Sequence, residues 1–425
     1  SNTLKKWSYK KTNRTNASTG QMPLFMFCKS LNGKCQINDT GVLTMHNFLF
    51  FTIVLVCVGL STVQAAEESE ACILVSKIGD VICAKSAKTK VSLFENSDAR
   101  TVIEWALENG DVTILEPGTY TVHDAVRVSR SGTSLIIKES ATLRMPYGTG
   151  SSYVSEYGAD YYPLIYVAPR DVFTRSSRLE NVSVINFGTL EASGKTDQPG
   201  RWGGGACIIY DGRKWERTCG IVGGTIFSSG VLTGSRGAAL WILDCKKTEI
   251  PLMCAEHYGN GVVAAEGCED LNIGILAGLA GEKAEENETI DLNYFNRNVR
   301  MGTVIGSAPS EEIVDINNAV NCTVENIVGY GDPKQIHLLG TTTYPITGAW
   351  MTMKRPIKKS VGTVAKKTEV VNKKVKEWKR ITEVPPLPES LPRFSVKAKL
   401  IAVFEDGSQQ VAFDETINFD LAGSE

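Results

Sequence analysis

The sequence predicts an all-β protein: a single-stranded right-handed parallel β-helix with a short N-terminal capping helix and a C-terminal strand pair. Three observations indicate this fold. Short apolar strands punctuated by Gly, Asn and Asp occupy residues 110–350, similar segments recur at a period in the twenties, and long amphipathic helices are absent. The 425 residues include 45 Lys and Arg, 47 Asp and Glu, and 39 Gly, a composition that excludes collagen, coiled coils and wholesale disorder.

The N-terminal region carries a targeting pattern. Residues 48–60 are an apolar run followed by small residues, which is typical of a secretory signal peptide over residues 45–66. We interpret residues 1–44 as an upstream leader outside the native protein. A signal anchor, with Lys29 and Lys34 on the cytoplasmic side, is the alternative. The expected protein is secreted and keeps no stable membrane span after cleavage.

Cysteines and glycosylation sequons fit this expectation. Of 11 Cys, eight follow residue 66, and an even count in a secreted chain indicates disulfides. Cys72–Cys83 and Cys207–Cys219 are candidate local pairs. Sequons for N-glycosylation begin at Asn181, Asn287 and Asn321.

The elements follow one another in a regular order. A helix is expected over Ala99–Glu108, and strands follow it, each bounded by turn residues. The expected strands are Val112–Leu115, Leu135–Ile137, Leu164–Val167, Val182–Ile185, Cys207–Tyr210, Leu240–Leu243, Val262–Ala265, Leu271–Ile275, Ile313–Ile316 and Val324–Val328.

Four segments repeat one local pattern, a small or apolar residue, two mostly polar residues and then apolar alternation. They begin at Leu179, Cys245, Cys268 and Ala319. Their spacings correspond to whole numbers of coils of 22 to about 25 residues, the signature of a solenoid. One coil cannot bury its apolar face alone, whereas stacked coils can. Cys245 and Cys268 fall at equivalent positions one coil apart, so a disulfide and a pair of stacked thiols are both open.

The repeats end near residue 350. Residues 351–392 are interpreted as a basic segment and Pro-rich linker, and residues 393–425 as a β-hairpin whose strands are Phe394–Phe404 and Gln410–Phe419. Residues 354–380 carry a net charge of +9, which leaves about −17 on the remaining mature chain. The basic run is either a solvated helix or linker, or a contact for an acidic polymer or for the acidic body. Nucleic acid is not an expected partner.

Residues 97–122, from Ser97-Asp-Ala-Arg-Thr-Val-Ile-Glu-Trp-Ala-Leu107 through Leu115-Glu-Pro-Gly-Thr-Tyr-Thr-Val122, resemble the entry to the pectin-lyase-like right-handed β-helices. The resemblance covers about residues 95–345, within an expected β-helix domain of residues 67–350. It implies a helix cap, a strand and a "P-G-T-Y" turn, and a groove that binds extended glycans.

A narrower similarity is to the polygalacturonase-type glycoside hydrolases. Asn186-Phe-Gly-Thr-Leu-Glu-Ala-Ser-Gly194 with Trp202 looks like their "G-T-I-D-G-x-G…W" stretch, and Ala239–Cys245 resembles the strand that follows. Tyr258-Gly-Asn-Gly-Val262 falls where that family places "N-T-D-G" and keeps Asn260 without the Asp. The Asp-Asp, Gly-His-Gly and Arg-Ile-Lys motifs are missing, so the catalytic acids of the family are not carried over.

Chemistry on such a scaffold needs acids and bases at successive coil positions. Inverting glycoside hydrolysis uses two carboxyl groups about 6.5–9.5 Å apart. The expected catalytic residues are Asp244, Glu256, Glu266 and His257, with Glu269 and Asp270 as further acids; solvated turn acids are the alternative. Asp244 and Glu266 are 22 residues apart, a spacing that predicts stacking one coil apart.

Lyase chemistry instead needs a base and a cation beside a uronate carboxyl. Arg213 and Lys246 are the expected substrate-binding cations, with Arg236 and Lys214 nearby. Trp202 and Trp215 are expected to stack on sugars, together with Asn260, whereas Trp241 is expected in the core. No metal site and no cofactor is expected, except Ca²⁺ if the protein is a lyase.

These observations predict a secreted protein that acts on or binds a polysaccharide. The resemblance favours polygalacturonase-like hydrolysis. A polysaccharide lyase and a non-catalytic glycan-binding or structural β-helix are the alternatives. The sequence leaves the oligomeric state open.

Overall fold

The computed structural model describes residues 70–151, 153–154, 160–170, 178–194, 204–213, 219–235, 237–258, 261–280, 288–293, 295–307, 312–342, 364–384 and 393–420. The expected signal peptide and leader lie outside these residues. In the described part of the chain, no helix has the length and apolar character to cross a bilayer.

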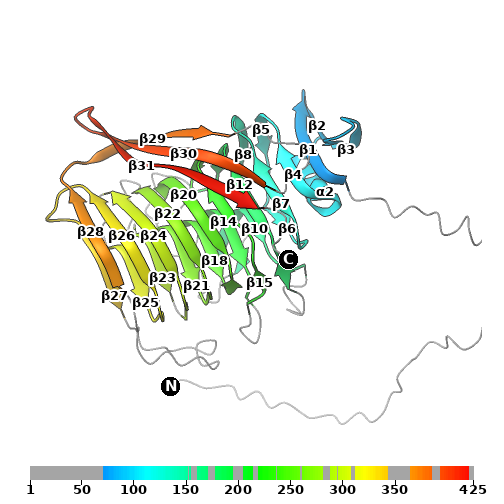
Figure 1. Ribbon diagram of the computed structural model, residues 1–425. Coiled ribbons are helices and arrows are strands. Elements are labelled where there is room, and N and C mark those ends of the chain that lie inside the picture. Colours follow the sequence, from blue (N-terminus) through cyan, green and yellow to red (C-terminus); the bar gives the residue numbers. More distant parts are fainter. Residues whose placement is uncertain are drawn as a thin grey trace, which may run out of the picture. The chain divides into compact units, whose positions relative to one another are not determined.

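Long parallel sheets dominate the described residues, as the sequence predicts for a parallel β-helix (Figure 1). The twelve-stranded sheet contains, in spatial order, β3 (Ser92–Asn96), β2 (Val81–Ser86), β1 (Glu70–Ile78), β4 (Gly110–Leu115), β7 (Ser134–Ile137), β12 (Ser183–Asn186), β16 (Ile226–Ser228), β20 (Glu249–Tyr258), β22 (Asn272–Ala280), β24 (Arg300–Ser307), β26 (Thr323–Tyr330) and β28 (Val364–Val371). From β1 to β28 its neighbours pair in parallel, while β1, β2 and β3 form antiparallel pairs.

A second long sheet runs beside the first. The nine-stranded sheet contains β6 (Val126–Val128), β10 (Asp160–Val167), β14 (Gly204–Asp211), β18 (Ala238–Leu243), β21 (Gly261–Glu266), β23 (Glu288–Asn293), β25 (Glu312–Asn317) and β27 (His337–Thr342), with β9 (Tyr153–Val154) antiparallel to β10. Each of these coils contributes one strand to each long sheet, so that β21 of the nine-stranded sheet, for example, is followed in the chain by β22 of the twelve-stranded sheet. Apolar side chains of both sheets point inward and form one continuous core.

Two shorter sheets complete the coils. A four-stranded sheet is formed by β5 (Gly118–Thr121), β8 (Ala141–Arg144), β13 (Thr189–Glu191) and β17 (Val231–Thr233). A three-stranded corner sheet is formed by β11 (Leu179–Glu180), β15 (Ile221–Val222) and β19 (Cys245–Lys246). These sheets bend the chain between the long ones.

The corners between strands explain why Gly, Asn and Asp recur between the apolar segments of the sequence. One corner of the coil takes a left-handed conformation at Asp244 (φ 48°) and at Gly267 (φ 66°), one coil further. The next corner does so at Asp270 (φ 56°), Asn298 (φ 55°) and Asn321 (φ 58°). Gly, Asn and Asp tolerate this conformation best. The Asn321 side-chain amide donates to Asn298 Oδ1 at 2.8 Å, so side-chain bonds join neighbouring corners.

The stacking of Cys245 over Cys268 is confirmed, because the Glu269 amide donates to the Cys245 carbonyl and brings the two corners into register. All eight described cysteines are buried thiols with no disulfide among them, so the disulfides expected from the even count are not found. The β1–β2 register explains one case: Cys83 lies opposite Ser76, while the Cys72 carbonyl accepts from the Ala87 amide. Small thiols fill the core as apolar groups.

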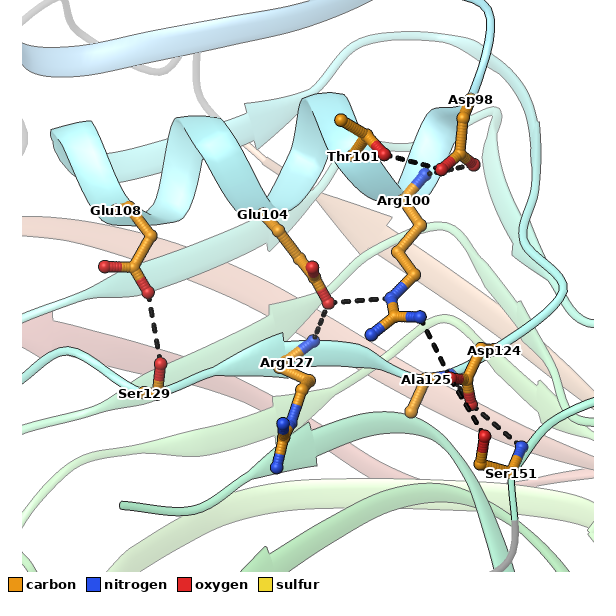
Figure 2. Close-up of polar contacts among 10 residues, drawn as sticks. All are labelled: Asp98, Arg100, Thr101, Glu104, Glu108, Asp124, Ala125, Arg127, Ser129 and Ser151. Carbon is orange, nitrogen blue, oxygen red and sulfur yellow. Dashed lines mark hydrogen bonds and ion pairs between the residues drawn. The ribbon is translucent and has the colours of Figure 1, made fainter. Parts of the chain in front are cut away.

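The expected capping helix is α2 (Ala99–Asn109), and it buries Val102, Ile103 and Ala106 against the first coil. Asp98 caps the N-terminus, since its carboxylate accepts from the Arg100 amide at 3.2 Å and from the Thr101 hydroxyl at 2.6 Å (Figure 2). The "P-G-T-Y" turn that follows is held by Tyr120, whose buried hydroxyl contacts the Val75 carbonyl at 2.8 Å.

The C-terminal strand pair is β30 (Arg393–Phe404) and β31 (Gln409–Asp420), and β29 (Val375–Glu383) adds a third antiparallel strand. The basic segment expected to be a helix or linker therefore contributes strands β28 and β29. This C-terminal sheet buries one face, including Trp378, Phe394 and Phe404, against the outer face of the twelve-stranded sheet. The alternating pattern of β30, exposed then buried, explains the packing.

Candidate functional site

Two of the expected catalytic acids lie at the carboxyl ends of neighbouring strands, β18 and β21, of the nine-stranded sheet. Glu266 ends β21, Asp244 follows β18, and each is 8% exposed. They lie on neighbouring coils as expected but one residue out of register, because Glu266 pairs with Leu243. Asp244 instead faces Gly267, where an added Cβ would lie 2.0 Å from Asp244 Oδ1. Asp244 therefore shapes a corner.

Glu256 lies on the other long sheet. Its carboxylate forms an ion pair with Arg380 of β29 at 2.7 Å, and the two side chains are only 18% and 14% exposed. This contact joins β20 to the C-terminal sheet. His257 follows Glu256 in β20, and its side chain lies outside the described part of the structure.

The expected substrate-binding cations, Arg213 and Lys246, both form ion pairs with carboxylates of the chain itself. Arg213 donates to Asp211 through Nε at 2.7 Å and Nη2 at 2.6 Å. Burial opposes ionisation of Asp211, but Arg213 and the Tyr166 hydroxyl outweigh burial and lower the pKa of Asp211.

Lys246 contacts Glu269 at 3.1 Å and Asp270 at 3.8 Å. The hydrogen bond and charge of Glu269 raise the pKa of Lys246. Trp202 and Trp215, the residues expected to stack on sugars, lie outside the described residues, and so do Asn260, Lys214 and Arg236. Trp241 is 1% exposed, in line with the expected core position.

The structure brings together a group of acids that the sequence reasoning missed. On the outer face of the nine-stranded sheet, Asp291 of β23 lies directly opposite Asp315 of β25. Asn293 donates to Asp291 Oδ2, and Asn317 donates to Asp315 Oδ2 at 2.6 Å. Asn317 also donates to Asn293 Oδ1 at 3.1 Å, so both Asp–Asn pairs form one network.

Further carboxylates surround this network. Glu266 of β21 lies opposite Asn293, and Glu288 and Glu312 begin β23 and β25. We name the five carboxylates the acidic ladder: Glu266, Glu288, Asp291, Glu312 and Asp315. Asp315 and Glu312 are half-buried, whereas the other three are at most 8% exposed. The described residues contain no group of three or more His, Cys, Asp or Glu arranged to hold a metal ion.

A signal for this site was present in the sequence. The tripeptides Asp291-Leu-Asn293 and Asp315-Ile-Asn317 repeat at the coil period. In a strand, residues two apart share one face, so an Asp-x-Asn repeat one coil apart predicts an aligned polar network.

A second polar cluster surrounds the capping helix (Figure 2). Arg100 bridges Glu104 and Asp124 at 2.9 Å each, and Glu104 accepts from the Arg127 amide at 2.9 Å. The Arg127 guanidinium lies 5.8 Å from the centre of the Tyr166 ring. Because its carboxylates are paired within the cluster, we interpret it as the clamp that holds the helix on the first coils.

No known family model matches the sequence, and no curated protein matches it. Two solved structures align with the chain. A candidate glycosyl hydrolase from Parabacteroides merdae aligns at 11% identity and a TM-score of 0.26, over 65% of this chain and 89% of that one. ORF18 of Geobacillus virus E2 aligns at 9% identity and a TM-score of 0.30, over 76% and 74% of the two chains. Similarity this low carries no functional argument.

Proposed function

We propose that this protein is a carbohydrate-active enzyme that hydrolyses glycosidic bonds of an extended polysaccharide along the outer face of the nine-stranded sheet. The observation that carries the proposal is the opposed pair Asp291 and Asp315, each hydrogen-bonded to an Asn of its own strand. Glycoside hydrolysis needs two carboxyl groups, one to act as acid or base and one as base or nucleophile.

The spacing of the pair suits this chemistry. Opposite residues on neighbouring parallel strands are about 4.8 Å apart, and the carboxyl groups of retaining glycosidases are roughly 5–5.5 Å apart. Glu266 is one strand back from Asp291 and two residues along, a diagonal of about 7–8 Å. The separation of Glu266 from Asp291 therefore lies in the range of inverting glycosidases. We assign the reaction to Asp291 with Asp315 rather than with Glu266, because Asp315 is half-buried whereas Glu266 is only 8% exposed.

The amides fix the carboxylates. Each Asn donates to one carboxylate oxygen, which orients the group toward the substrate side of the sheet. Five carboxylates on three strands repel polyanions, so we expect neutral sugars to be preferred over uronates. A lyase is less favoured, since the described candidates Arg213 and Lys246 already pair with carboxylates of the chain.

The experiment is an assay of residues 67–425, produced through a secretory route, on neutral and uronate polysaccharides. New reducing ends without ultraviolet absorbance from unsaturated uronate are expected. Asp291→Asn and Asp315→Asn should each lower kcat by at least about 100-fold, the lower range for one general acid or base. Asp270→Asn, at a corner away from the ladder, is the matched control and should keep full activity.

Product stereochemistry tests the assignment. Retention of the anomeric configuration is expected, whereas inversion would assign the reaction to Asp291 with Glu266. Unsaturated products would show a lyase. Activity that survives both Asn variants would contradict the proposal outright.

The second candidate is a non-catalytic glycan-binding or structural protein. The observation that favours it is the near-complete burial of Asp291 (4% exposed) and Asn293 (2% exposed) within a side-chain ladder that joins neighbouring coils. On this reading, Asp291→Asn lowers stability while glycan binding without cleavage persists in the parent protein.

A further inference from the structure

The two ends of the coil stack are built differently. At the N-terminal end, α2 buries Val102, Ile103 and Ala106 against the first coil, and β1, β2 and β3 continue the sheet in antiparallel pairs. At the C-terminal end, β27 and β28 are the last strands of the two long sheets (Figure 1). Among the strands that the structure describes, none pairs with the outer edge of either one. In this part of the chain, the stack therefore ends on two strand edges.

Core positions are exposed at this end. Val314 and Ile327, in the coil before the last, are completely buried. The residues that pair with them in the last coil, Leu339 and Thr368, are exposed, and Leu339 keeps 37% of its surface. Val370 of β28 is 38% exposed. Because a solenoid needs a terminal repeat with a polar outer side, exposed apolar positions here indicate a contact surface for another molecule.

The charges of β28 identify a second copy of this chain as that molecule. Glu369 pairs with Val328, which packs on the outer face of the sheet, and Lys367 shares this face because it lies two residues away. The two side chains are 48% and 68% exposed. Between them, Thr368 is aligned with the core residue Ile327.

This order of charges is self-complementary. When two copies of β28 pair in antiparallel orientation around a two-fold axis at Thr368, Lys367 of each copy lies opposite Glu369 of the other copy. Both contacts join opposite charges on one face of the sheet, which stabilises paired strands. The same axis turns the exposed Leu339 and Val370 of one copy toward the open end of the other. Pairing therefore satisfies the strand edge, the charges and the exposed apolar side chains together.

We propose that the protein forms a two-fold dimer through the C-terminal ends of its coil stacks, in which β28 pairs antiparallel with β28 of a second copy. The twelve-stranded sheets of the two copies then form one continuous sheet. Growth stops at two copies, because a two-fold contact uses the same edge of both and α2 closes the other end of each stack. The proposal does not depend on hydrolysis.

Sedimentation velocity of residues 67–425, produced through a secretory route, measures the mass over a concentration series. The parent protein should change from monomer to dimer. Lys367→Glu and Glu369→Lys each place like charges at both symmetric contacts and should weaken self-association at least roughly tenfold. An equimolar mixture of the two variants should regain the dimer, because two acids of one copy then face two lysines of the other.

Asp80→Lys is the matched control. It reverses a charge in the exposed turn between β1 and β2, at the opposite end of the stack, and should leave the dimer unchanged. Hydrogen exchange locates the contact. In the parent protein, amides of β28 should exchange more slowly as the protein concentration rises, whereas amides of β3 should not change.

Each outcome decides the proposal. A dimer that both single variants weaken and their mixture restores supports it, and the restoration also shows that both variants are folded. A dimer that persists in both variants, an equal loss in Asp80→Lys, or self-association without protection of β28 overturns it. A monomer at every concentration also overturns it and assigns Lys366 and Lys367 to protection of the edge against pairing.

Discussion

The ion pair between Glu256 and Arg380 leads to a prediction that separates a structural from a catalytic role for Glu256. In Glu256→Gln, Arg380 keeps its charge in a site where the two side chains are only 18% and 14% exposed. Exposed pairs contribute roughly 0.2–1 kcal/mol, and breaking a fully buried pair costs about 3–5 kcal/mol. The intermediate burial gives an expected loss of about 2 kcal/mol in the docking of the C-terminal sheet.

Hydrogen exchange of the full chain measures this loss locally. About 2 kcal/mol corresponds to about 30-fold faster exchange of amides in β29 and β30, with little change in β21 and β23. Glu256→Gln combined with Arg380→Met should recover part of the loss, because the isolated charge is then absent. Glu369→Gln breaks the exposed pair Glu369–Lys367 and is the matched control, with a change below about 0.5 kcal/mol. Normal exchange in Glu256→Gln together with lost hydrolysis would refute the structural role and return Glu256 to the active site.

Three further predictions concern stability. Gly230→Ala should lower the free energy of unfolding by more than about 3 kcal/mol, because the added Cβ would lie 2.1 Å from the Gly188 carbonyl oxygen. Gly261→Ala should be tolerated, because the atom nearest to its Cβ would be 3.4 Å away. Thermal melting compares the two variants. Asp98→Ala removes the cap of α2 and should cost about 1 kcal/mol in urea titration, with Asp111→Ala, beyond the helix, as control. Burial raises the pKa of Cys207, Cys254 and Cys322 to about 11, so from pH 9 to 11 the unfolded chain loses protons that the folded chain keeps, and stability should fall as pH rises. Cys322→Ala should weaken the pH dependence of the urea midpoint. An unchanged pH dependence would contradict the raised pKa of the Cys322 thiol.

Much of the coil could be predicted from the sequence because burial leaves a periodic record. Alternating apolar residues, and the corners that need Gly, Asn or Asp, gave the parallel stack and the register of Cys245 over Cys268. The third C-terminal strand was missed because the Lys residues of β29 obscure its buried Val375 and Trp378.

The site was less accessible to sequence reasoning. The spacing of residues does not define the exact register between two coils. Asp244 was expected to stack on Glu266, but the residue that pairs with Glu266 is Leu243, one position earlier. Glu256 forms an ion pair with Arg380, which lies 124 residues later in the chain, and no local sequence pattern predicts this contact. The repeated Asp-x-Asn tripeptides were visible, but their importance depends on the parallel pairing of β23 with β25.

The C-terminal sheet changes how the stack should unfold. In a simple solenoid each coil touches only its neighbours, so the end coils can fray independently. Here Phe394 packs against Phe187, which directly follows β12, and Phe419 packs against Phe227 of β16. Trp378 and Phe404 pack against Tyr330 of β26. One sheet thus links coils more than 100 residues apart. Loss of the last coils removes contacts from the middle of the stack, and the protein should lose its structure as one cooperative unit rather than coil by coil.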